Sequence, residues 1–100
     1  MTLFRFASAA RRDPAVETWM REREDALGAI ARRWFEVMRG CGDDVRELLH
    51  DGHPTACVAD AAFAYVNAFT AHVNVSGSFA APRLRIETAY ADMKARVEAD

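Results

Sequence analysis

The sequence has few cysteines, prolines and glycines, no strong excess of either charge and no long apolar run. Its two cysteines, three prolines and five glycines in 100 residues form neither a disulfide framework nor a low-complexity tract. Thirteen basic and fifteen acidic side chains give a net charge of −2, whereas a dedicated nucleic-acid-binding domain is usually strongly basic. No apolar stretch approaches the roughly 20 residues of a membrane helix. We therefore expect neither nucleic acid nor a membrane as a partner.

The composition that remains is that of a small globular protein. Hydrophobic residues make up 51% of the chain and charged residues 28%, which suits one domain with a single modest core. The opening MTLFRFASAARR has too short an apolar run for a secretory signal, because Arg5 interrupts it. We predict a flexible tail over residues 1–12 and one domain over residues 13–100. The predicted location is cytoplasmic, where Cys41 and Cys57 stay reduced.

Helical signals occur near both ends of the chain. Asp13 followed by Pro14 is typical of a helix start, because aspartate caps free N–H groups and proline suits the first helical position. Apolar residues recur every three or four positions in residues 26–39, and Gly40 follows as a stop signal. The same spacing returns after Pro82. These patterns predict two N-terminal helices and one C-terminal helix.

Residues 43–51 are predicted to form a further helix. Asp43 and Asp44 place negative charge where a helix N-terminus is positive. The apolar face of this helix consists of Val45, Leu48 and Leu49. The helix is expected to end near Gly52, because Pro54 prevents easy continuation.

The hydrophobic period changes from helical to alternating after this point. Residues 55–59, 62–69 and 72–76 are predicted to be strands with short connections. In the second of them, Phe63, Tyr65, Asn67 and Phe69 share one side. Helices and strands are thus segregated along the chain. The predicted class is α+β, with N-terminal helices, a three-stranded antiparallel meander and a C-terminal helix.

The stretch DVRELLHDGHPTACVADAAFAYVNAFTAHVNV resembles the YdhG-like domain family, a bacterial domain family of unknown function. The flanking segments DPAVETWM, ARRWFEVMRGCGDD and IETAYADMKARVEA are similar to its N-terminal and final helices. The resemblance implies a small α+β domain with an antiparallel sheet. Some members are described as frataxin-like, which implies an intracellular iron-chaperone role for those members.

The sequence departs from the family pattern before the last helix. Relatives carry a glycine-rich stretch and a basic strand there, whereas this chain passes from Val75 through SGSFAAP to Arg83. The role of the absent segment cannot be carried over to this protein. A missing strand leaves a sheet edge uncovered, and an uncovered edge favours pairing with a second copy of the chain. A homodimer is therefore one predicted assembly.

A cluster of candidate metal ligands extends from the end of the helix predicted over residues 43–51 to just beyond the first predicted strand. It contains His50, His53, Cys57 and Asp60, all of which are ligand types for zinc or iron. His72 can join it from the third strand. The spacing matches no strong zinc pattern, and Cys57 and Asp60 point to opposite faces of a regular strand. The alternative interpretation is a turn at Asp51-Gly52 that feeds a strand in which Cys57 is a buried apolar residue.

Acidic side chains offer a second candidate for iron. Asp43, Glu47 and Asp51 recur every four residues and therefore share one face of the predicted helix. Exposed carboxylates of this kind bind iron weakly and reversibly, as the frataxin-like resemblance implies for a carrier. The alternative is an ordinary solvated face, since Arg46 and other arginines are interleaved.

The remaining candidates concern small ligands and catalysis. Tyr65 and Asn67 lie on the aromatic side of the second predicted strand and can hydrogen-bond a ligand in a pocket, although alternating aromatics also form cores. Cys57 with His53 or His72 is a possible nucleophile pair, but no third residue orients the base. We predict no catalytic residues. The predicted function is non-enzymatic iron or small-ligand binding, with a protein-interaction or homodimerising module as the alternative.

Overall fold

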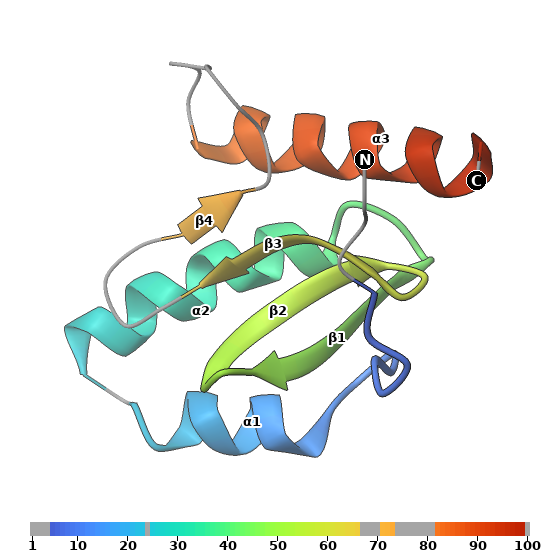
Figure 1. Ribbon diagram of the computed structural model, residues 1–100. Coiled ribbons are helices and arrows are strands. Elements are labelled where there is room, and N and C mark those ends of the chain that lie inside the picture. Colours follow the sequence, from blue (N-terminus) through green and yellow to red (C-terminus); the bar gives the residue numbers. More distant parts are fainter. Residues whose placement is uncertain (1–4, 24, 67–70, 74–81, 100) are drawn as a thin grey trace.

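The computed structural model describes residues 5–23, 25–66, 71–73 and 82–99 (Figure 1). Within these residues, helices and strands are segregated along the chain, so the predicted α+β class is confirmed. The elements are α1 (Pro14–Arg21), α2 (Ala26–Arg39), β1 (Val45–His50), β2 (His53–Val58), β3 (Ala61–Val66), β4 (Ala71–Val73) and α3 (Pro82–Ala99).

Aspartates start the first two helices, as the sequence indicates for the first of them. Asp13 accepts a hydrogen bond from the backbone N–H of Ala15 at 2.8 Å, and Asp25 accepts one from Gly28 at 2.8 Å. These bonds satisfy backbone donors that have no partner inside the helix. Helix α2 ends before Gly40, so the helix predicted over residues 26–39 is confirmed.

The sheet is antiparallel and its strands follow chain order, β1-β2-β3-β4. Strands β2, β3 and β4 correspond to the predicted three-stranded meander, to which β1 adds a fourth strand. Residues 67–69 and 74–76 of the predicted strands lie outside the described residues. The turn between β1 and β2 is formed by Asp51 and Gly52, whose φ angles are 50° and 78°. Two consecutive positive φ values match a tight hairpin turn that agrees with the right-handed twist of the strands. A register shift at Ala56 and Cys57 interrupts the pairing of β2 with β3.

The helix predicted for residues 43–51 is wrong, because residues 45–50 form β1. The alternation of this strand is hidden in the sequence by Glu47, a charged residue that is only 1% exposed. Glu47 pairs with Ala56 across the sheet. Because Glu47 interrupts the apolar residues of the buried side, the remaining apolar residues Val45, Leu48 and Leu49 have the spacing of a helix.

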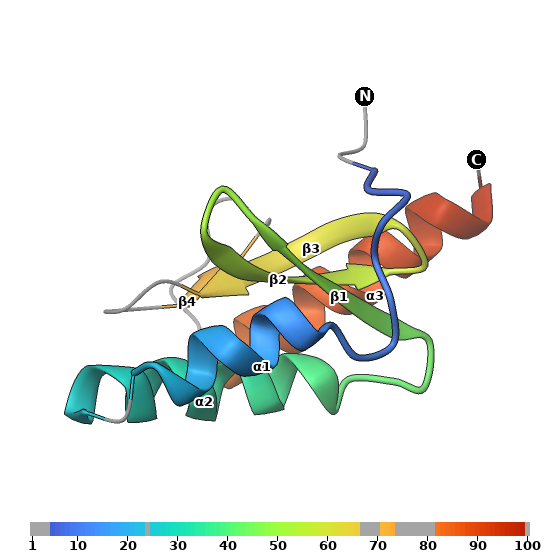
Figure 2. The ribbon, with the colours of Figure 1, turned by 90° about the horizontal axis from the view of Figure 1, so that it is seen from below.

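The helices pack together on one face of the sheet, and their inner side chains join those of the strands in one core (Figures 1 and 2). The largest members without exposed surface are Phe35, Met38, Phe63, Ile86 and Met93. The N-terminal segment, predicted as part of a flexible tail, contacts the sheet at residues 5–10. Ala10 and Glu47 exchange backbone hydrogen bonds of 2.9 and 2.6 Å at the free edge of β1.

Candidate functional site

The predicted histidine cluster is only partly brought together. His50 and His53 are directly opposite each other in the β1–β2 hairpin. Their rings face different neighbours: His50 lies 4.5 Å from Phe6 and His53 lies 5.7 Å from Tyr65, between ring centroids. His72 is the register partner of Tyr65 on β4, and its side chain lies outside the described residues. Strand β3 therefore separates the backbone of His72 from β2 by two strand spacings, about 9.6 Å.

The predicted acidic face does not exist, because its residues do not belong to one helix. Asp43 is exposed before β1, and Asp51 is exposed in the hairpin turn. Glu47 lies between them in the sequence and is buried. Both of its carboxylate oxygens accept hydrogen bonds from Arg39, at 2.8 and 2.9 Å. Glu47 is thus occupied by an internal partner.

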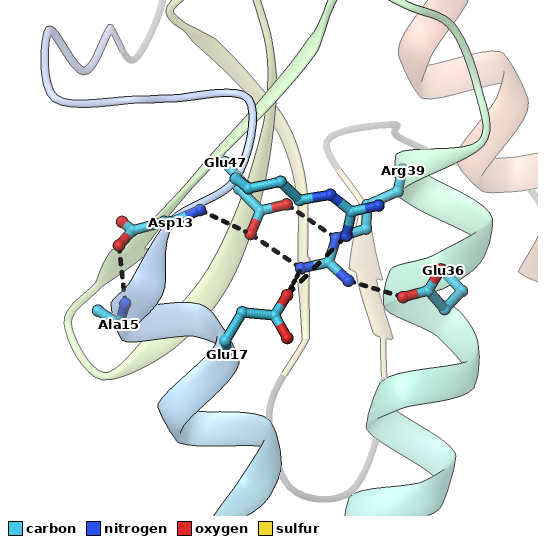
Figure 3. A network of polar contacts seen from close by, with 7 residues as sticks. Asp13, Ala15, Glu17, Glu36, Arg39 and Glu47 are labelled. Atoms are coloured by element: carbon cyan, nitrogen blue, oxygen red, sulfur yellow. Dashed lines mark hydrogen bonds and ion pairs between the residues drawn. The ribbon is translucent and has the colours of Figure 1, made fainter.

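Arg39 is the centre of an ionic network in which Glu47 is buried and the other two carboxylates are exposed (Figure 3). Besides Glu47, its guanidinium donates to Glu36 and to Glu17, each at 2.7 Å. Burial alone lowers the pKa of Arg39, but the bonds to these carboxylates outweigh it and raise the pKa above its ordinary value. The backbone N–H of Asp13 donates to Glu47 at 3.2 Å. The network joins α1, α2, β1 and the N-terminal segment, and we interpret it as structural.

Within the described part of the chain, no three His, Cys, Asp or Glu side chains lie close enough together to hold a metal ion. Of the two residues predicted to bind a small ligand, Tyr65 is 39% exposed and Asn67 lies outside the described residues. The predicted sites therefore remain separate features rather than one constellation.

A groove between α2 and α3 has a volume of about 600 Å³. One wall comes from the second half of α2 and the turn after it, and the other from the first half of α3. Its lining consists of Arg33, Glu36, Val37, Gly40, Cys41, Arg83, Glu87 and Tyr90. A volume of this size suits a small-molecule site, which typically occupies roughly 300–1,000 Å³.

Some of the polar groups in this groove are already engaged. Glu36 is held by Arg39, and the hydroxyl of Tyr90 donates to Asp44 at 2.5 Å. The thiol of Cys41 lies 3.5 Å from the carbonyl of Val37. Burial raises the pKa of Cys41 to about 11, so this thiol is protonated at neutral pH.

The other charged groups of the groove have no ionic partner among the described residues. They are Arg33, which lies 5.3 Å from the centroid of the Trp34 ring, and Arg83 and Glu87 on α3. All three are exposed. The groove therefore presents two positive charges and one negative charge that no ion pair within these parts of the chain neutralises.

Tyr90, which lines the groove, lies where α3 meets the segment that follows α2. Lys94 lies 3.3 Å from Asp44 and 3.4 Å from the Tyr90 hydroxyl. A side chain at Gly42 would overlap that hydroxyl and lie 2.8 Å from the Asp44 carboxylate, so the close approach of α3 requires glycine here. The donated bond from Tyr90 lowers the pKa of Asp44. Burial and the Asp44 bond together raise the pKa of Tyr90.

Cys57, the nucleophile of the candidate pair with His53 or His72, is completely buried. Burial, with a smaller contribution from Asp60, raises its pKa to about 12. A thiol with so high a pKa provides very little of the thiolate that nucleophilic catalysis needs. The structure therefore favours the interpretation of Cys57 as a small apolar residue of the sheet.

No family model, no curated protein and no solved structure matches this chain. Among the described helices, none is both long enough and apolar enough to cross a membrane.

The groove was not predicted from the sequence. The helical spacing of Arg33, Val37 and Cys41 marks one face of the α2 region, but only the packing of α3 turns that face into a groove.

Proposed function

We propose that this protein is a small, non-enzymatic, YdhG-like binding domain of the cytoplasm that takes a small ligand in the groove between α2 and α3. The observation that supports this proposal is the size of the groove, about 600 Å³, combined with three charged side chains on its walls that lack ionic partners in the described residues. Polar groups that converge on a groove of this size are typical of a ligand site. The order of helices and strands agrees with the small α+β domain that the resemblance implies.

A fragment library screened by NMR tests this function. We expect hits to shift the amide signals of Gly40, Cys41 and Glu87, which lie on both walls. The variant Gly40→Met places a flexible side chain in the groove at a helical φ of −79°, and the nearest atom to its Cβ is a carbonyl oxygen at 3.4 Å. It is expected to fold and to lose the hits.

The matched control adds the same side chain elsewhere. Ala95 is exposed on α3 and does not line the groove, so Ala95→Met should bind the same fragments as the original protein. Hits that map to other surfaces, or that survive Gly40→Met, would contradict the proposed site.

Iron binding is a second candidate function, supported by the position of His50 directly opposite His53. Two imidazoles on neighbouring strands lie about 5 Å apart at their Cβ atoms, which permits both to approach one ion. Anaerobic titration of Fe(II), with Zn(II) in parallel, should broaden the amide signals of the hairpin first. Signals that ignore both metals would remove this candidate and leave the groove proposal untouched.

A further inference from the structure

The groove between α2 and α3 carries two basic side chains and one acidic side chain without ionic partners among the described residues, and these charges indicate the class of its ligand. Arg83 and Glu87 lie four residues apart on α3 and both line the groove. Oppositely charged residues at this spacing often pair on a helix, but pairing is weaker when the basic residue comes first along the chain. Among the ion pairs of the described residues, none joins these two side chains, and each is exposed. They therefore present separate positive and negative positions to a ligand.

Arg33 adds a second positive position from the opposite wall. Its guanidinium is placed near the ring of Trp34, at 5.3 Å, and has no carboxylate partner in the parts of the chain that are described. Guanidinium groups match carboxylate and phosphate oxygens through paired N–H donors. An anionic group that contacts Arg33 and Arg83 would therefore bridge the two walls of the groove.

Glu87 distinguishes this groove from a simple anion site. A carboxylate beside two guanidiniums repels a ligand that carries only negative charge, and it attracts an ammonium group. The charges of Glu87 and Arg83 both act on the thiol of Cys41, which also lines the groove. Burial is the main cause of the raised pKa of Cys41, but Glu87 raises it further and Arg83 lowers it.

We propose that the groove binds a small zwitterion, with its carboxylate or phosphate group between Arg33 and Arg83 and its ammonium group at Glu87. This inference rests on the proposed function of the groove. Residues four apart on a helix are separated by roughly 5–6 Å at their Cβ atoms. A ligand with its charges a few bonds apart therefore fits better than an α-amino acid, whose charges are adjacent.

Three compounds of equal chain length test this proposal: γ-aminobutyrate, butyrate and butylamine. The readout is the set of amide shifts at Gly40, Cys41 and Glu87 during titration of the full chain. We expect γ-aminobutyrate to bind about tenfold more tightly than either singly charged compound, since each end gains one charge-assisted contact. O-Phosphoethanolamine, added in a separate titration, distinguishes a phosphate from a carboxylate as the preferred anion.

Two substitutions separate the charged ends. Glu87→Gln should reduce the affinity for γ-aminobutyrate about tenfold and leave that for butyrate unchanged or higher, because the repulsion is removed. Arg83→Gln should weaken the binding of both. The matched controls are Glu98→Gln and Arg11→Gln, which change the same charges at exposed positions outside the groove and should bind all compounds as the original protein does.

The outcomes distinguish this inference from the function on which it rests. Equal affinity for butyrate and γ-aminobutyrate, or no effect of Glu87→Gln, would overturn the zwitterion and leave a groove that binds anions. Equal affinity for butylamine would overturn it in favour of a cation. No shift with any of these compounds, while library fragments still map to the groove, would overturn the ligand class alone. No hit of any kind would overturn both proposals.

Discussion

At the scale of single residues, the pair of Arg39 and Glu47 is the feature with the largest expected effect on stability. Their side chains are 11% and 1% exposed. Arg39→Met leaves the Glu47 carboxylate buried without a counter-charge, which typically costs about 3–5 kcal/mol. This is a large part of the free energy of unfolding of a domain this size, roughly 5–15 kcal/mol. Urea denaturation measures the loss.

The double variant Arg39→Met/Glu47→Leu is the informative control. It removes the buried charge as well as its partner, so it should recover at least half of the loss. Arg21→Met changes an exposed arginine at the end of α1 and should alter stability by less than about 0.5 kcal/mol. An Arg39→Met variant as stable as the original would mean that Glu47 does not depend on this partner.

Asp44 gives a residue-scale prediction about pH. Its pKa is lowered by the hydrogen bond from Tyr90, so its contribution to stability is present above the unfolded pKa of about 3.9. That contribution is lost as the pH falls through the lower folded value. Asp44→Asn should therefore destabilise the protein at about pH 6 and have a smaller effect at about pH 2.5. Denaturation of the original protein and of Asp44→Asn at both pH values measures this difference. In a Tyr90→Phe background, which lacks the hydrogen bond to Asp44, the loss of stability caused by Asp44→Asn should depend less on pH.

At the scale of elements, both described hairpin turns should favour glycine, because each holds a residue at positive φ. Gly52 has a φ of 78° and no other atom within 4 Å of the point that a Cβ would occupy, so Gly52→Ala meets backbone strain alone. Ala59, in the β2–β3 turn, has a φ of 53°. We expect Gly52→Ala to cost about 1 kcal/mol and Ala59→Gly to stabilise by up to about 1 kcal/mol. Thermal unfolding of both variants, with Gly40→Ala as a control at negative φ, measures these effects.

The elements also show where prediction from the sequence stops. The helices and the three later strands follow from capping residues and from their own periodicity, which are local properties. Strand β1 does not follow from the sequence, because Glu47 looks like an exposed residue until its partner is known. That partner, Arg39, lies on α2 and contacts Glu47 only in the folded chain. The groove is non-local for the same reason, since its walls come from α2 and α3, which all four strands separate along the chain.

At the scale of the whole molecule, the N-terminal segment closes one edge of the sheet. Arg5 bonds to Asp60 at 2.6 Å, and the backbone of Phe6 donates to the Asp60 carbonyl at 2.7 Å. Further along, Ala10 pairs with Glu47 on the free side of β1. A sheet edge with unpaired N–H and C=O groups attracts a second chain. The segment therefore opposes self-association at β1.

Removing residues 1–11 tests this role. The truncated protein should lose about 2 kcal/mol of stability, because the paired backbone groups and the contact of Phe6 with His50 disappear. It should also form a dimer at concentrations where the full chain is monomeric, which sedimentation velocity detects. Arg5→Gln is the control, since it removes one exposed ion pair worth less than about 1 kcal/mol and leaves the edge covered. A truncated protein that stays monomeric would show that the β1 edge does not recruit a second copy. A dimer of the full chain would contradict this prediction. The opposite sheet edge, β4, would then be the candidate interface of the predicted homodimer.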